Sequence, residues 1–191
     1  SSISVGLLCL ASYLKNKGYS VKIIDGARQN NYEKLFKEAV SASAIIGFSV
    51  MTTQVASALS GAEKIRRLNP KAVIVFGGLH PTLFPDSTAG HNLIDIAVIG
   101  EGEEALFEIC ESHKKTVGQK GDFIEFSKHL ADVRGIAFKD LSGKVVLTPK
   151  RPLLQMTDLP LPDWNLEPKE IKGIKSEGMV LAAQDSKHNI S

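Results

Sequence analysis

Four short apolar runs of the sequence each end in a loop rich in glycine, polar or hydroxyl-bearing residues. Glycine lets a ligand approach the backbone closely, and Ser and Thr supply hydrogen-bond donors without bulk. These residue types favour the binding of a large ligand, and we expect none of them to act as an acid, a base or a nucleophile. The candidate binding residues are Asp25, Gly26, Ser49, Val50, Met51, Thr52, Thr53, Gln54, Gly77, Gly78, His80, Pro81, Thr82, Gly100, Glu101 and Gly102.

The elements before these loops alternate between two hydrophobic periods. Apolar residues at helical spacing occupy 5–17, 31–40, 55–68 and 103–115, and short runs that are apolar on both faces occupy 21–25, 44–50, 71–78 and 94–100. Buried strands separated by amphipathic helices are typical of parallel sheets with helices on both faces. The sequence therefore predicts a doubly wound α/β fold of the flavodoxin or Rossmann type, over residues 1–117.

The alternation of helix and strand patterns ends in the last third of the chain. RGIAFKD and KVVLTP flank LSG and predict a β-hairpin, and LPLPDW at 159–164 is a stiff, proline-spaced connector. We therefore expect a hairpin extension of the same domain at 118–158 and a linker at 159–191.

Open α/β sheets bind ligands beyond the carboxyl ends of their strands, so the four loops should form one broad, shallow cradle. Turn formation and helix capping explain any single loop equally well, but four similar loops at one predicted edge favour a shared ligand. A dinucleotide is disfavoured, although GEGEEA fits G-x-G-x-x-A. Glu101, Glu103 and Glu104 would place three carboxylates where a pyrophosphate must sit.

Composition excludes several other classes of protein. The 23 basic and 21 acidic residues are mixed along the chain, so neither a nucleic-acid surface nor an acidic tail is indicated. No apolar run approaches the length of a membrane span, and the start of the chain lacks the basic region of a signal peptide, so we expect a cytoplasmic protein. Cys9 and Cys110 match no metal or redox spacing and are expected to be buried thiols.

Over residues 5–170 the chain resembles the N-terminal cobalamin-binding domain of B12-dependent radical SAM enzymes. The resemblance rests on an ordered set of segments: GLLCLASYLKNKGYSVKIIDG, IIGFSVMTTQ, VIVFGGLHPTLFPD, IDIAVIGEGEEAL, IAFKDLSGKVV and LPLPDW. It implies a corrinoid on the strand ends, close to the glycines, with residues 77–82 lining the pocket. By the same resemblance Ser49, Thr52, Thr53 and Gln54 bind the amides and phosphate of the cofactor.

The sequence departs from other B12 domains at the cobalt ligand. Mutases and methionine synthase carry Asp-x-His-x-x-Gly, whereas Asp25 is followed here by Gly26 and Ala27. Alanine at the ligand position excludes histidine coordination from this loop. His80 lies in the predicted crevice, and we favour a turn or capping role for it over cobalt ligation.

The second departure concerns the catalytic part of the family. Its barrel opens with Cys-x-x-x-Cys-x-x-Cys, which holds a 4Fe-4S cluster that cleaves S-adenosylmethionine, and no cysteine follows Cys110 here. The cluster and S-adenosylmethionine are thus expected only in a full-length enzyme with its radical SAM barrel. The chain begins at the family's first helix, so we expect a truncated chain whose sheet has a gap or a different pairing, and possible homodimers through an open strand edge.

The leading hypothesis is a cobalamin-binding module of a B12-dependent radical SAM enzyme, of methyltransferase type, in which the corrinoid accepts and donates the methyl group. The alternative is a non-catalytic flavodoxin-like interaction or receiver domain without a corrinoid. A third reading, a self-sufficient enzyme with metal on Glu101, Glu103 and Glu104, is disfavoured because acidic residues in a first helical turn are stabilised by the helix dipole. No catalytic residue and no protein-bound metal is predicted.

Overall fold

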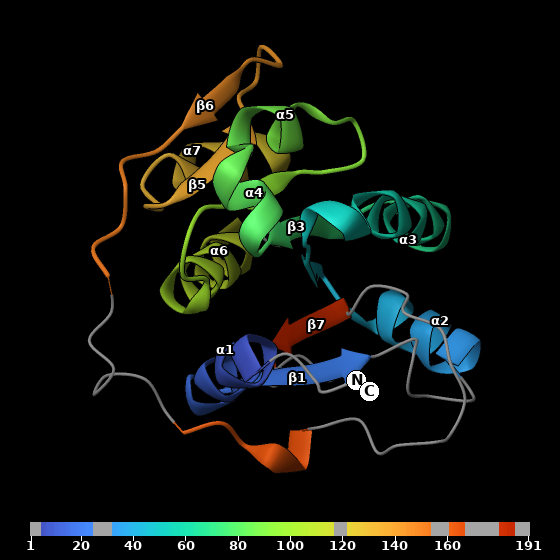
Figure 1. Cartoon of the computed structure of the whole chain (residues 1–191). Helices are drawn as coiled ribbons and strands as arrows, with labels where there is room; N and C mark the ends of the chain where they lie inside the picture. The colour runs from blue at the N-terminus through green and yellow to red at the C-terminus, as the bar shows by residue number, and fades with distance from the viewer. Residues whose placement is uncertain (1–4, 25–31, 117–121, 154–160, 167–179, 186–191) are drawn as a thin grey trace.

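A computed structural model describes residues 5–24, 32–116, 122–153, 161–166 and 180–185, with the backbone alone for 122–123 and 180–185 (Figure 1). A seven-stranded sheet in the order β1-β7-β2-β3-β4-β5-β6 runs through the molecule. Its strands are β1 (Tyr19–Ile24), β2 (Ile45–Ser49), β3 (Val73–Gly77), β4 (Ile96–Val98), β5 (Ile136–Lys139), β6 (Val145–Leu147) and β7 (Val180–Asp185).

The centre of the sheet is parallel, with β2 paired to β3 and β3 to β4. Helices cover both faces, as the sequence predicts, and the doubly wound α/β class is confirmed. The helices are α1 (Val5–Asn16), α2 (Tyr32–Ala42), α3 (Val55–Leu68), α4 (Leu79–Leu83), α5 (Pro85–Gly90), α6 (Glu103–Thr116) and α7 (Asp122–Leu130), with short 3-10 turns η1 (Thr52–Gln54) and η3 (Trp164–Leu166).

Alternation along the strands divides the interior into two cores. Val73 and Val75 of β3 point into a core built with α1, α6 and α7, whereas Ile74 and Phe76 point into one built with α2 and α3. Successive strand side chains face opposite sides of a sheet, so strands that are apolar throughout can fill both cores. The cradle predicted from the sequence lies where the first of these cores reaches the carboxyl ends of the strands.

Strand β7 is the main departure from expectation. The sequence analysis placed Val180–Asp185 in a linker, but the structure pairs these residues antiparallel to β1 on one side and to β2 on the other. Of the two outcomes expected for the sheet, a gap or a different pairing, the structure shows the second. The ladder satisfies the facing backbone groups of β1 and β2, which would otherwise lack partners. The division of the chain at residues 117 and 158 stays a prediction.

Two further differences concern short helices. The loop after β3 folds into α4 and α5. Helix α5 begins with Pro85 in its first turn, where the backbone N–H that proline lacks would have no acceptor within the helix. Helix α7 was also not predicted. The hairpin is present as expected, since β5 and β6 are antiparallel and β5 extends the sheet from β4.

Candidate functional site

The loops after β2 and β3 are joined by backbone hydrogen bonds. Ser49 and Gly77 end their strands side by side in register. The Val50 N–H donates to the Gly77 carbonyl at 2.8 Å, and the His80 N–H donates to the Val50 carbonyl at 3.0 Å. Two of the predicted loops thus form one continuous surface, and the backbone of His80 has the turn role expected for this residue.

Gly78 is required where these loops cross. Its φ is +98°, and a Cβ atom there would lie 2.9 Å from the Val50 nitrogen and 3.0 Å from the Val50 oxygen. A side chain would therefore be strained by both the backbone conformation and the contact. The close crossing of the two loops depends on glycine at this position.

Thr82 connects the loop after β3 to the loop after β4. Its hydroxyl donates to the Gly78 carbonyl at 2.8 Å and accepts a hydrogen bond from the Gly100 N–H at 2.9 Å. Gly100 has a φ of +81°, which favours glycine. The ends of β2, β3 and β4 are therefore tied together as the sequence analysis expected.

Below these loops lies a cavity of about 260 Å³, between one face of the sheet and helices α1 and α6. Alternate residues of three strands form its sheet wall: Gly47 and Ser49, Val75 and Gly77, and Val98, with Gly100 beyond it. Leu10 of α1 and Leu106 of α6 contribute to the opposite wall. The cavity thus lies between the sheet and two helices, whereas the sequence analysis considered only the loops at the strand ends.

Glu103, at the start of α6, brings a carboxyl group to this cavity. The whole Glu103 residue has 8% of its surface exposed to solvent. Burial raises the pKa of this carboxyl and the charge of Glu101 raises it further, against the backbone N–H groups of Glu103 and Gly102, which lower it. The neighbouring Glu104 instead pairs with Arg151 at 2.7 Å.

The turn η1, which follows β2, adds polar groups beside the strand ends. Thr52 and Thr53 are exposed, and Thr52 Oγ1 lies 3.4 Å from His80 Nδ1. The Gln54 side chain accepts a hydrogen bond from the Met51 N–H at 3.0 Å, which closes the turn. The His80 ring packs on Phe84, with ring centroids 5.2 Å apart.

Of the residues predicted from the sequence, six line the cavity: Ser49, Gly77, Gly78, Gly100, Glu101 and Gly102. Eight more lie on the loops after β2 and β3 but do not line the cavity: Val50, Met51, Thr52, Thr53, Gln54, His80, Pro81 and Thr82. Asp25 and Gly26 lie outside the described residues.

Sequence reasoning missed the residues that approach the cavity from the strands and from the other layer. Gly47 gave a usable signal, because a glycine inside a strand often marks close approach of another group. The contributions of Leu10 and Glu103 depend on how α1 and α6 pack, and no local pattern reveals that. In the described part of the chain, no group of three or more His, Cys, Asp or Glu side chains is arranged to hold a metal ion.

Cys110 has the burial that the sequence analysis expected for both thiols, and Cys9 does not. Cys110 is buried, Cys9 is half-buried, and both are free; desolvation raises the pKa of the Cys110 thiol to about 12. Among the helices that the structure describes, none has both the length and the hydropathy needed to cross a bilayer.

The model of the B12 binding domain matches residues 2–109, which include α1 and the ends of β2, β3 and β4. The chain belongs to the B12 binding domain family. This confirms the resemblance found in the sequence. The matched region contains the cavity walls on the sheet and on both helices, so the site described above is part of the B12 binding domain.

Two curated relatives resemble the chain over most of its length. It is 29% identical over 164 residues to the anaerobic magnesium-protoporphyrin IX monomethyl ester cyclase of Rubrivivax gelatinosus, covering 82% of this chain and 28% of the relative. It is 26% identical over 172 residues to the cytidylyl-2-hydroxyethylphosphonate methyltransferase of Streptomyces wedmorensis, covering 78% and 30%. The chain thus spans less than a third of either relative.

Solved structures share the fold of this B12 binding domain. The cobalamin-dependent S-adenosylmethionine radical enzyme OxsB, with aqua-cobalamin and S-adenosylmethionine bound, superposes with a TM-score of 0.58 at 21% identity, over 79% of this chain and 20% of OxsB. Its apo form gives a TM-score of 0.54 at 19% identity. The likeness extends beyond residue 109, so it includes parts of the chain outside the family match.

Proposed function

We propose that this chain is the cobalamin-binding module of a B12-dependent radical SAM enzyme of methyltransferase type, and that it holds the corrinoid at the carboxyl ends of β2, β3 and β4. The observation that carries the proposal is the 260 Å³ cavity between glycine-bearing strand ends within the B12 binding domain. A bound corrinoid would supply the methyl-accepting and methyl-donating chemistry.

The residues present fit such a group. A Cβ atom on Gly77 would meet only Phe48 and Val98, at an ordinary 3.9 Å, so the absence of a side chain leaves room at the cavity wall. That space suits the nucleotide tail of cobalamin. Thr52 and Thr53 are exposed on the turn after β2, where their hydroxyls are available as hydrogen-bond partners for the polar amides of a corrin ring.

The contribution of this chain is to bind and orient the group and to keep water from it. Met51, Leu79, Leu83 and Phe84 are large apolar side chains between 49% and 58% exposed, and they lie on the loops around the site. A flat ring placed over these loops would bury part of this surface and gain hydrophobic stabilisation. No residue is assigned a proton-transfer step.

The rest of the proposal concerns the whole protein. A radical SAM barrel with its 4Fe-4S cluster and S-adenosylmethionine would belong to the parts of such an enzyme beyond this chain. Cytoplasmic location and dimerisation through an open strand edge, both expected from the sequence, are likewise proposed.

A titration with hydroxocobalamin, followed by gel filtration and the visible spectrum of the protein peak, tests the proposal. We expect co-elution with a shifted spectrum. Gly77→Leu should abolish binding because its side chain fills the cavity, and Gly77→Ala should weaken binding less. Gly90→Ala is the matched control, since a Cβ there meets Val145 at an ordinary 3.7 Å, away from the cavity.

Absence of co-elution by the wild-type chain, with its fold confirmed by circular dichroism, would contradict the proposal and favour the corrinoid-free interaction domain. Equal binding by wild type and Gly77→Leu would contradict the assignment of this cavity.

A further inference from the structure

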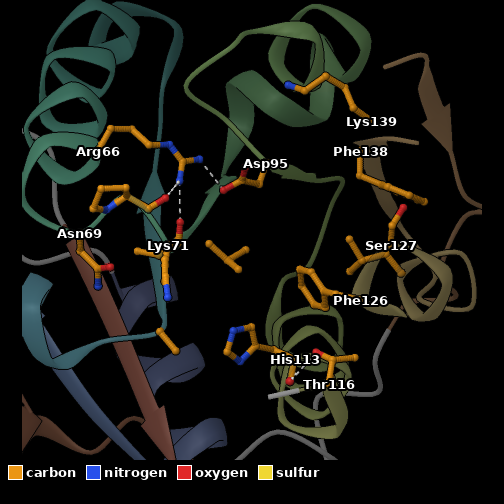
Figure 2. Close-up of a pocket in the computed structure, with 15 residues that line it drawn as sticks. Arg66, Asn69, Lys71, Asp95, His113, Thr116, Phe126, Ser127, Phe138 and Lys139 are labelled. Atoms are coloured by element: carbon orange, nitrogen blue, oxygen red, sulfur yellow. Dashed lines mark hydrogen bonds and ion pairs between the residues drawn. The ribbon is translucent and has the colours of Figure 1, made fainter. Parts of the chain in front are cut away.

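A larger cavity of about 650 Å³ lies at the opposite, amino-terminal edge of the parallel strands (Figure 2). It is bounded by the end of α3, the start of β3 and helix α7, and Val73 at the first position of β3 marks the edge. It shares no lining residue with the 260 Å³ cavity of the B12 binding domain, which is called the B12 cavity below. Its volume falls in the range of about 300–1,000 Å³ that is typical of small-molecule sites.

The floor of this cavity is apolar. Val73, Phe126, Leu130 and Phe138 line it and are each at most 8% exposed, so they are held in place by the core beneath α6 and α7. The His113 ring packs edge-on against Phe126, with centroids 5.6 Å apart. Such a floor presents rigid hydrocarbon and aromatic surface to a ligand.

Two of the charged groups around the floor neutralise each other. Arg66 and Asp95 form an ion pair at 2.5 Å. Arg66 also donates to the Ala72 carbonyl at 2.6 Å and to the Leu93 carbonyl at 3.2 Å. The guanidinium is thus engaged by the protein, and the pair adds no net charge to the cavity.

Lys139 adds a positive charge whose donors are already used. Its Nζ donates to the carbonyls of Ala89, His91 and Ile94 at 2.8, 2.8 and 2.9 Å. Three donated bonds use the three protons of an ammonium group. Burial lowers the pKa of this group and the charge of Asp95 raises it, so the carbonyls and Asp95 oppose the cost of desolvation. This charge raises the potential of the cavity without offering a ligand a hydrogen bond.

Lys71 supplies the remaining charge. It is exposed, lines the cavity, and makes no hydrogen bond or ion pair with any residue in the described part of the chain. Figure 2 shows it on the wall across the cavity from Phe126. The cavity therefore combines an apolar floor, a net positive charge and one cationic donor at its margin.

We infer that this cavity binds a small amphipathic carboxylate, with its apolar body on Val73, Phe126, Leu130 and Phe138 and its carboxylate at Lys71. The positive charges of Lys71 and Lys139 favour an anion over a neutral ligand of the same shape, because they attract the carboxylate. A carboxylate paired with an ammonium makes a charge-assisted hydrogen bond, stronger than one between neutral groups.

The inference does not depend on cobalamin and is tested separately, with 2-naphthoate and its uncharged analogue 2-naphthamide. Each is titrated into the isotope-labelled chain while backbone amide signals are followed by NMR. We expect shifts at residues 71–73, 113–116 and 126–130, a naphthoate dissociation constant of about 1 mM or tighter, and binding of naphthamide about tenfold weaker.

Lys71→Gln should reduce naphthoate binding to the level of naphthamide and leave naphthamide unchanged. Lys37→Gln, a substitution of another exposed lysine on α2, should change neither. Equal affinity for the two probes, an unchanged Lys71→Gln variant, or shifts confined to the loops of the B12 cavity would each overturn the inference. Shifts in the same region with an acidic peptide but not with naphthoate would also overturn it, in favour of a protein-docking face.

Discussion

Thr82 Oγ1 lies 2.9 Å from the Gly100 nitrogen and accepts its hydrogen bond, which joins the loops after β3 and β4 across 18 residues of sequence. The same hydroxyl donates to Gly78, so one side chain holds both glycine loops of the B12 binding domain in place.

Thr82→Val keeps the shape of the side chain and removes both hydrogen bonds. We expect the free energy of unfolding to fall by about 1–2 kcal/mol and cobalamin binding to weaken, because the loops lose their connection. Urea denaturation and the hydroxocobalamin titration measure the two effects. Thr53→Val, at an exposed hydroxyl, serves as the stability control. Equal stability of the two variants would show that the Thr82 bonds contribute little.

Gly78→Ala tests the crossing of the loops after β2 and β3. The substitution incurs the cost of a positive-φ extended backbone that is essentially limited to glycine, about 1–3 kcal/mol, and adds a contact at 2.9 Å with Val50. Gly143→Ala is the matched control, since φ is +82° there and a Cβ would meet nothing within 4 Å. We expect Gly78→Ala to lower the unfolding midpoint clearly more than Gly143→Ala. A comparable loss in both would indicate that the loops move apart to accept the methyl group.

Glu103 makes the stability of the domain depend on pH. Its pKa is raised by burial above the ordinary 4.5, so the folded state binds more protons than the unfolded state in the interval between the two values. Stability therefore falls as pH rises through this interval, and the loss is complete above the folded-state pKa. Glu103→Gln removes the ionisation. We expect it to stabilise the protein at pH 7.5 and to have little effect at pH 4.

The measurement is urea unfolding of wild type and Glu103→Gln at both pH values, with Glu38→Gln, at an exposed glutamate of α2, as the control. Stabilisation of the same size at pH 4 would mean that the effect comes from something other than the carboxylate charge.

Strand β7 connects β1 to the rest of the sheet, because it pairs through its backbone with β1 on one side and with β2 on the other. Ala183→Pro removes a backbone donor and places a ring inside a central strand. We expect amide hydrogen exchange in β1 and β2 to accelerate by at least about tenfold, with β3, β4 and β5 less affected. Val146→Pro in the edge strand β6 should accelerate exchange in β5 alone. Unchanged exchange in β1 after Ala183→Pro would contradict the pairing.

Local patterns in the sequence were enough to predict the alternating core. Helix α3 spans the same residues, 55–68, that its apolar spacing and the following Asn69-Pro70 predict. The apolar runs of β2 and β3 and the hairpin of β5 and β6 were equally clear. These features depend on neighbouring residues, which is the information that a sequence displays directly. The loops that end the strands, and the resemblance to cobalamin-binding domains, followed from the same reading.

Tertiary structure decided what depends on contacts between distant segments. Val180–Asp185 carries no strong strand pattern, and it forms β7 because β1 and β2 leave backbone donors and acceptors to be paired. The contribution of Leu10 to the 260 Å³ cavity was likewise hidden, because it depends on how α1 packs on the sheet. The raised pKa of Glu103 follows from burial, which exists only once α6 has packed on the sheet. The sequence by itself thus determined the alternating helices and strands of the core, while packing decided the order of the strands, the position of β7 and the shape of the cavity.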